Sequence, residues 1–169
     1  MSTLRVDTIL GESGAERRGL MTYAIICDQK AAATAGGTFT SGAWQTRELN
    51  TTIADPDSIV SIANDQFTLQ AGSYFIESSA PAYHCDRHQT RLYNATASSV
   101  VQAGQPMYCS DADNVNNFSN IFSRVTLTSS TAFEIQHRCE QSHTGNGFGV
   151  EGNFGESSIY TVVKIYKEA

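Results

Sequence analysis

The feature that most constrains this fold is a series of short strand-like stretches separated by turn residues. From Met21 onward, runs rich in Val, Ile, Tyr, Phe and Thr alternate with turns that contain Gly, Asp and Ser. None of these runs shows the 3.6-residue apolar period of an amphipathic helix. Many strands at close spacing predict an all-β protein, either a sandwich or a jelly roll. The predicted strands are Tyr23–Asp28, Trp44–Asn50, Ile59–Ile62, Gln66–Gln70, Ser73–Ser79, Gln89–Asn94, Phe118–Thr128, Thr131–Cys139 and Ser157–Lys167, with Val100–Val101 as a short addition.

The last predicted strand is unusual because apolar side chains occupy both of its faces. Val163 and Ile165 point to one face. Tyr160, Val162 and Tyr166 point to the other. A sandwich strand of a monomeric protein usually has one face in water. The pattern therefore indicates either a subunit interface or a covering loop, and the sequence leaves both open.

The overall charge limits the partners that we expect. The 169 residues hold 11 Lys and Arg against 17 Asp and Glu, which gives a formal net charge of −6. Since no basic cluster is longer than Arg17–Arg18, we do not expect a nucleic-acid partner. No apolar run approaches the ~18 residues of a membrane span, and the N-terminus lacks the order of a signal peptide. We therefore expect synthesis in a reducing cytoplasm and no membrane insertion.

Four cysteines are spread along the chain, at positions 27, 85, 109 and 139. An even number permits disulfides, but the pairing cannot be deduced from sequence, and whether any disulfide forms stays open. Because thiols usually stay reduced in a cytoplasm, we expect free and mostly buried cysteines.

The densest group of potential metal ligands is the run HCDRH at 84–88. Histidine and cysteine both bind zinc, so His84, Cys85 and His88 are candidate ligands. The spacing matches no structural zinc motif, however, and no second Cys or His pair follows nearby. On an extended strand, His84 and His88 would share one face and Cys85 would point to the opposite face. We therefore interpret the run as polar residues in a loop between strands and predict no metal site there.

Other site chemistry finds little support in the sequence. His137 and Cys139 are predicted to point inward from one strand, which favours burial over a Cys–His nucleophile pair. No nucleophile elbow occurs, so we predict neither catalytic nor cofactor-binding residues. The acidic turns at 55–57 and 111–113 offer oxygen ligands. Calcium is therefore an alternative to simple turn formation at these two places.

The first twenty residues have a different character from the rest. Leu4, Val6 and Ile9 supply an apolar pattern close to period two, which predicts one short strand, and the run GESGAERRG after it resembles a linker. A lone strand can neither bury its apolar face nor satisfy its backbone groups, so it must dock onto this chain or another protein. We therefore divide the chain into an N-terminal extended arm, 1–20, and a single domain, 21–169.

One run carries a resemblance to a known family. FTLQAGSYFIE (67–77) resembles the central signature of the C1q/TNF-like jelly roll. The surrounding blocks at 38–51, 88–101, 133–139 and 146–155, with a terminal aliphatic strand, also stand in the order that this family shows. Together they are similar to virion-surface and tail-fibre domains of bacteriophages, those of cyanophages especially, over nearly the whole chain.

The resemblance implies a homotrimer of jelly rolls packed around a threefold axis, with no enzymatic activity. Tyr160, Val162 and Tyr166 would then lie at the trimer interface. The N-terminal MSTLRVDTI is similar to the attachment end of such proteins, so we expect the arm to bind other virion proteins, of the tail or the capsid, through Leu4 and its apolar neighbours. The arm can reach only ~65 Å when fully extended, which predicts a knob on a short tether and no shaft.

These expectations define a virion-surface protein with two possible positions. As a tail fibre it would adhere to the host surface, with a surface glycan as a possible ligand. As a capsid decoration it would brace the particle. A free carbohydrate-binding lectin of the same fold is the alternative from a different functional class.

Overall fold

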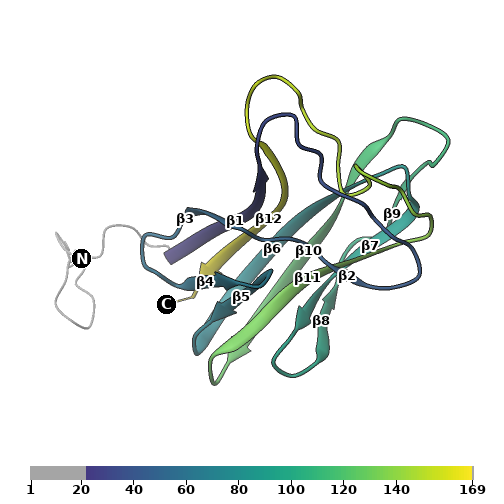
Figure 1. Cartoon of the computed structure of the whole chain (residues 1–169). Coiled ribbons are helices and arrows are strands. Elements are labelled where there is room, and N and C mark those ends of the chain that lie inside the picture. Colours follow the sequence, from purple (N-terminus) through teal and green to yellow (C-terminus); the bar gives the residue numbers. More distant parts are fainter. Residues whose placement is uncertain (1–21, 169) are drawn as a thin grey trace, which may run out of the picture.

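The computed structural model describes residues 22–168, and these residues form twelve strands and no helix (Figure 1). The strands make two antiparallel sheets, with the orders β10-β6-β12-β1-β3 and β4-β5-β11-β7-β8. β2 pairs with β11, and β9 pairs with β7. The predicted all-β jelly roll is therefore confirmed. The strands are β1 (Thr22–Lys30), β2 (Gln45–Thr46), β3 (Thr51–Ala54), β4 (Val60–Ala63), β5 (Gln66–Leu69), β6 (Gly72–Tyr83), β7 (Asp86–Asn94), β8 (Ser99–Ala103), β9 (Met107–Cys109), β10 (Asn116–Leu127), β11 (Thr131–Cys139) and β12 (Ser158–Lys167).

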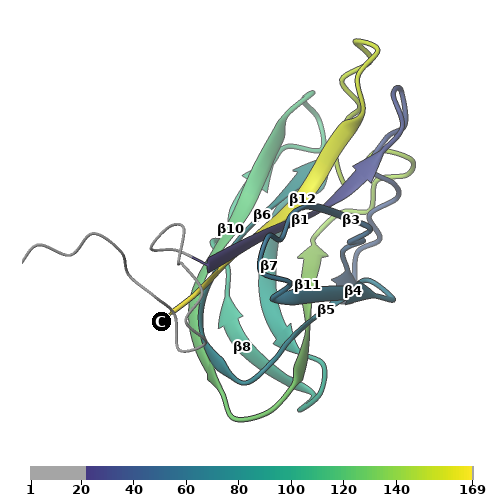
Figure 2. The same cartoon turned by 90° about the vertical axis from the view of Figure 1, so that its left-hand side faces the viewer.

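The two sheets enclose one main apolar core (Figure 2). Alternation along β11 buries Phe133 and Ile135, as the sequence pattern predicts. Phe133 stacks on Phe67 of β5 with 5.5 Å between the ring centroids. Tyr74 and Ile76 of β6 fill the same core from the opposite sheet. The run at 67–77 therefore joins two sheets, because β5 and β6 belong to different layers.

The predicted strand Trp44–Asn50 is wrong in its bounds. The strand β2 spans two residues, and the chain then leaves the sheet because the Arg47 side chain turns into the interior, where it is 1% exposed. The next pairing, β3, begins only at Thr51 and joins β1 in the other sheet. The sequence pattern also missed β9, whose three residues pair with β7.

The topology places the two ends of the domain together. Thr22 pairs with Lys167, so the chain enters and leaves at one end of the sandwich. The loops at 31–44 and 140–157 lie at the opposite end, beyond the end of β1 and the start of β12 (Figure 1). The arm residues Leu4, Val6 and Ile9 lie outside the described residues. The described part of the chain contains no helix capable of crossing a membrane.

Candidate functional site

The outward face of the five-stranded sheet carries large apolar side chains that stay exposed within residues 22–168. Phe122 is 56% exposed, Phe118 44% and Phe75 43%. Val162 and Tyr166 of β12 are half-buried on the same outward face. We call these five residues the aromatic face. Exposed apolar patches of this kind mark interaction sites in soluble proteins.

The strand register organises the aromatic face into rows. Phe75 lies opposite Tyr166, and Tyr166 lies opposite Tyr23 of β1, so one aromatic row crosses three strands. In the next row Phe122 lies opposite Glu77, whose carboxylate is 3.8 Å from the ammonium group of Lys164. Arg124 of β10 also lies opposite Phe75 and forms an ion pair with Glu168 at 2.6 Å. The apolar side chains of the face therefore lie among two ion pairs.

The structure places the three predicted interface residues differently. Val162 and Tyr166 belong to the aromatic face, with intermediate exposure. Tyr160 is only 4% exposed, because the backbone at Gly149 packs against its ring. The Tyr160 hydroxyl donates a hydrogen bond to the carbonyl oxygen of Thr34 at 2.6 Å. The covering loop that the sequence left open is therefore present over Tyr160.

The outward face of the seven-stranded sheet is polar, and its groups find partners within the chain. Glu134 accepts hydrogen bonds from Gln66 at 2.8 Å, Gln136 at 2.7 Å and Thr46 at 2.9 Å. Burial would raise the pKa of Glu134, but these hydrogen bonds outweigh it and lower the pKa. We call this surface the polar face.

A cation–aromatic stack completes the polar face. The guanidinium of Arg91 lies 4.1 Å from the centroid of the Trp44 ring and 5.1 Å from that of Tyr93. The Nε of Arg91 donates to the side-chain oxygen of Gln136 at 2.8 Å. One side of the only tryptophan is therefore occupied by the chain itself.

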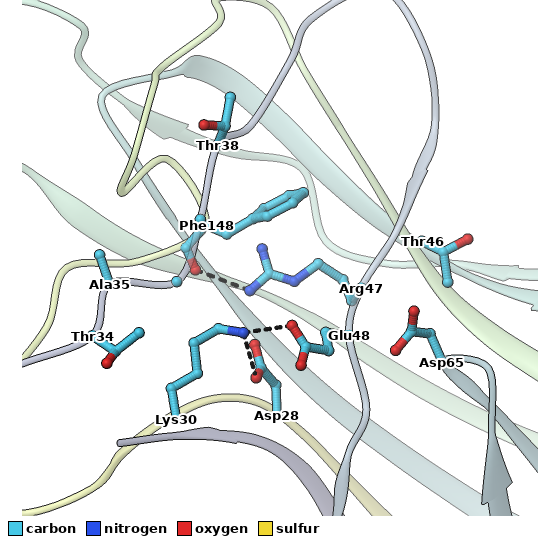
Figure 3. Close-up of a pocket in the computed structure, with 12 residues that line it drawn as sticks. Asp28, Lys30, Thr34, Ala35, Thr38, Thr46, Arg47, Glu48, Asp65 and Phe148 are labelled. Carbon is cyan, nitrogen blue, oxygen red and sulfur yellow. Dashed lines mark hydrogen bonds and ion pairs between the residues drawn. The ribbon is translucent and has the colours of Figure 1, made fainter. Parts of the chain in front are cut away.

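A pocket of about 410 Å³ opens at the loop end of the sandwich (Figure 3). Lys30 lies at its wall between two carboxylates, 3.2 Å from Asp28 and 2.5 Å from Glu48. Burial would lower the pKa of Lys30, but the hydrogen bonds and charges of the two acids raise it. The pKa of Glu48 is lowered, chiefly by the hydrogen bond from Lys30. A lysine held in this way stays protonated, so it is unsuited to act as a base or nucleophile.

Arg47 is buried beside this pocket and connects several parts of the chain. Its side chain donates to the hydroxyl of Thr161 at 2.8 Å and to the carbonyl oxygens of Pro81 at 3.3 Å and Phe148 at 2.9 Å. The guanidinium carbon also lies 4.0 Å from the ring centroid of Phe148. Burial lowers the pKa of Arg47 to about 9, which still leaves the group charged at neutral pH. Arg47 is therefore a buried cation whose hydrogen-bond acceptors are all neutral.

A group of thiols and one imidazole is buried at the same end of the sandwich. We call Cys85, His88, Cys109 and Cys139 the thiol–histidine cluster. The sulfur atoms of Cys85 and Cys109 are 3.3 Å apart, and all four cysteines of the chain are free. The Cys85 thiol donates toward Cys109, which lowers the pKa of Cys109 to about 5 and raises that of Cys85.

The expected geometry of the HCDRH run is wrong. His84 and His88 do not share a face: His88 is 3% exposed within the cluster, whereas His84 contacts Asn114 near the surface. The reason is the backbone, because His84 and Asp86 adopt positive φ angles of 51° and 57° and break the strand alternation. Cys85 consequently points inward from a tight turn.

A chain of hydrogen bonds fixes the protonation of His88. Asn117 donates through its amide nitrogen to the carbonyl of Tyr108 at 2.5 Å, so its oxygen faces His88 and accepts from Nε2 at 2.6 Å. Nδ1 of His88 is then the unprotonated atom and accepts from Nε2 of His137 at 2.9 Å. Nδ1 of His137 is buried without a partner. A buried polar atom without a hydrogen-bond partner lowers the free energy of unfolding by roughly 1–3 kcal/mol.

The acidic turns behave as turns in the structure. The carboxylate of Asp55 accepts backbone hydrogen bonds from Ile59 at 2.8 Å and Val60 at 3.2 Å. Across residues 22–168, the cluster of Cys85, His88 and Cys109 is the one place where three His, Cys, Asp or Glu ligand atoms gather within 4.8 Å. Neither 55–57 nor 111–113 forms such a group within that part of the chain.

No protein-family model and no curated protein matches the chain. Several solved structures have a similar fold. The globular domain of zebrafish complement 1qA protein has a TM-score of 0.52 and 11% identity, over 86% of this chain and 94% of that chain. The Eiger TNF structure from S. frugiperda gives 0.57 and 11%, over 89% and 94%. PRD1 vertex protein P5 gives 0.55 and 10%, over 89% and 99%. The likeness shows that the fold is a C1q/TNF-like jelly roll.

Proposed function

We propose that this chain is a non-enzymatic structural protein of a bacteriophage virion surface, and that it assembles as a homotrimer. The observation that carries the proposal is the aromatic face, where three phenylalanines stay 43–56% exposed on one sheet of a jelly roll. Aromatic residues at this density are typical of contact surfaces. The similarity in fold to vertex protein P5 of phage PRD1 supports the virion context.

In the proposed trimer the aromatic face is buried between protomers. Phe75, Phe118 and Phe122 contribute the largest apolar area, and Val162 and Tyr166 adjoin them on β12. Tyr160 packs behind the loop that contacts the neighbouring protomer. The ion pair of Glu77 and Lys164 lies among these side chains and helps to define the register of the contact.

The positions of the chain ends support an attachment end and a display end. Because Thr22 pairs with Lys167, the arm joins the domain at the end opposite the loops 31–44 and 140–157. We propose that the arm binds another virion protein through Leu4, Val6 and Ile9, and that the loops face outward. Three copies of each loop on one rigid trimer would raise avidity for a host-surface glycan without a tight single site.

The pocket and the buried cluster support a role without catalysis. Lys30, Asp28 and Glu48 satisfy one another, and the thiols are closed off from solvent. The thiols lack access to a substrate, and the ion pairs keep Lys30 protonated, which leaves it unsuited to act as a base or nucleophile.

Sedimentation equilibrium of the full chain tests the assembly. We expect a mass of three chains at micromolar concentration. A monomer that persists at every accessible concentration would refute the homotrimer, since the apolar face would then be stable in water.

Imaging of intact particles tests the location and the anchor. A label on the C-terminus should appear at the tail if the protein is a fibre, or over the shell if it decorates the capsid. A variant without residues 1–20 should still form a trimer but fail to join the particle. Normal incorporation of that variant would exclude the arm as the anchor.

A trimer that binds glycans but no virion component would instead identify a free lectin.

A further inference from the structure

The thiol–histidine cluster links three separate segments at the loop end of the sandwich. Cys85 lies in the turn between β6 and β7, and His88 follows on β7. Cys109 ends β9, and Cys139 ends β11. A single bound atom at their centre would cross-link all three segments. Neither the aromatic face nor the pocket beside Arg47 explains why these residues converge.

We propose that the thiol–histidine cluster binds one structural zinc ion. The ligand atoms of Cys85, His88 and Cys109 lie within 4.8 Å of one another, and the first and last are 3.3 Å apart. Neighbouring ligand atoms of tetrahedral zinc are roughly 3.5–3.8 Å apart, as follows from Zn–S and Zn–N distances of about 2.3 and 2.0 Å. These three ligand atoms therefore already lie close to the separation that tetrahedral zinc requires.

Cys139 supplies the fourth ligand. It is the direct cross-strand partner of His88, and it packs with Cys85 and Cys109 in the same buried cluster. Three thiolates and one imidazole form one of the usual zinc sets in structural sites. On binding, three Zn–S bonds and one Zn–N bond form, and three thiol protons leave to solvent.

The neighbours of His88 prepare it as a ligand. A zinc-binding histidine usually donates its second N–H to a carbonyl or carboxylate oxygen. Nε2 of His88 donates in this way to Asn117, which is itself held by Tyr108. Nδ1 therefore carries the free electron pair. The zinc takes this pair in place of the N–H of His137, a residue whose other ring nitrogen is already without a partner.

The charge around the cluster also suits a zinc site. Three thiolates and one Zn²⁺ carry a net charge of −1. Arg47 is a buried cation that hydrogen-bonds only neutral oxygens in Thr161, Pro81 and Phe148. The carboxylate of Asp28 is its main electrostatic partner, and Cys85 also lies within electrostatic range. A buried cation without a bonded anion is costly, so an anionic centre nearby offsets that cost.

The burial of the ligands assigns a structural role to the zinc. Cys85 and Cys109 are 0% exposed, His88 3% and Cys139 5%. A catalytic zinc keeps one position open to water or substrate, whereas a structural zinc is closed by four protein ligands. The ion would therefore stabilise the fold at the loop end, and this inference does not depend on the virion assignment.

Metal analysis of the full-length protein tests the proposal. After purification in zinc-containing buffer with a reductant, we expect one zinc per chain. Replacement by Co²⁺ should give the intense visible absorption of tetrahedral cobalt and a thiolate charge-transfer band. Cys85→Ser and Cys109→Ser should each lose stoichiometric metal. Cys27→Ala is the matched control, because Cys27 is equally buried on β1 but lies outside the cluster, so it should keep the metal.

Two further measurements keep the test decisive if the cysteine variants fail to fold. A thiol-competing chelator added to the wild type should lower its Tm, and zinc should restore it. Asn117→Ala should weaken zinc affinity about 10–100-fold while the fold is retained. Protein that takes up neither Zn²⁺ nor Co²⁺ in reductant would overturn the proposal. So would a disulfide between Cys85 and Cys109 that persists in reductant.

Discussion

Outward polar side chains at the middle of the seven-stranded sheet bond to one another, whereas three outward phenylalanines of the five-stranded sheet stay 43–56% exposed within residues 22–168. In that range, the seven-stranded sheet leaves large apolar side chains exposed only on its strands β8 and β9, where Val100 is 52% and Tyr108 56% exposed. On the polar face, Glu134 accepts three side-chain hydrogen bonds and Arg91 stacks on Trp44. On the aromatic face, Phe75 and Phe122 are 43% and 56% exposed. The two sheets thus share a core but differ in their outward side chains, which bond to one another on the polar face and stay exposed to solvent on the aromatic face. The difference is the basis for placing the contact of the proposed trimer on the aromatic face.

The largest effect should follow from charging the aromatic face. The double substitution Phe75→Asp with Phe122→Asp removes two apolar anchors and places carboxylates in the contact. If each anchor is worth about 2 kcal/mol or more, trimer dissociation should rise by roughly 10³-fold or more. Sedimentation velocity should show a monomer. Val100→Asp is the control, since Val100 is 52% exposed on β8 of the other sheet. Equal dissociation by the control would remove the distinction between the faces.

A single change at the margin of the aromatic face should have a smaller effect. Val162 is half-buried on β12 and lies opposite Ser79 and Cys27. Val162→Asp should weaken the trimer by about 10–100-fold, corresponding to one buried apolar side chain of roughly 1.5–3 kcal/mol. Dilution followed by light scattering measures the shift. A dissociation constant equal to that of the wild type would place β12 outside the interface.

Changes on the polar face should leave assembly unaltered. Arg91→Ala removes the cation–aromatic contact with Trp44 and should cost about 0.5–1 kcal/mol of the free energy of unfolding. The emission of Trp44, the only tryptophan, should shift to the red because its ring gains water. Arg87→Ala, on the same strand but paired with Glu140, is the matched control and should not shift the emission. Loss of the trimer in Arg91→Ala would show that the polar face also makes subunit contacts.

The smallest expected effect is a pH dependence that originates on the polar face. The pKa of Glu134 is lowered from 4.5 in the folded chain. Its ionised form therefore stabilises the fold above about pH 4.5, and this contribution is lost as the pH falls through the lower folded value. Urea unfolding between pH 6 and pH 3 should show a slightly shallower loss of stability in Glu134→Gln, by less than about 1 kcal/mol. A steeper loss in the variant would reverse the assigned sign.

Regular alternation made much of the fold predictable from sequence. The strand Thr131–Cys139 has the predicted bounds, because five of its residues point to one buried face and period two reports burial directly. The sequence did not predict β3 and β9, because neither strand has a regular alternation of buried and exposed residues. Ile53 of β3 is 50% exposed, and β9 has only three residues that are held by β7. Such strands form because they pair with a neighbouring strand, and their own residue pattern does not indicate them.

The two candidate sites differ in how much of them the sequence could indicate. The aromatic face has a local signal, since Phe118 and Phe122 alternate along β10 with the buried Ile121. The thiol–histidine cluster has only a partial one: the run at 84–88 contains Cys85 and His88, but Cys109 is 24 residues from Cys85 and meets it only through the sheet. The positive φ angles on either side of Cys85 also reverse the side that strand alternation assigns to it.

In the proposed virion protein, the hydrogen-bonded loops at the end opposite Thr22 have a consequence for recognition. Gly36 donates to Gly149 at 2.9 Å, and Phe39 and His143 exchange backbone hydrogen bonds at 2.9 and 2.8 Å. Arg47 holds the same loops from below through Phe148. Because these loops are already ordered by hydrogen bonds, they lose little conformational entropy when a ligand binds to them. Variation in specificity should therefore concentrate beyond this ladder, at 150–157, where Phe154 is 91% exposed.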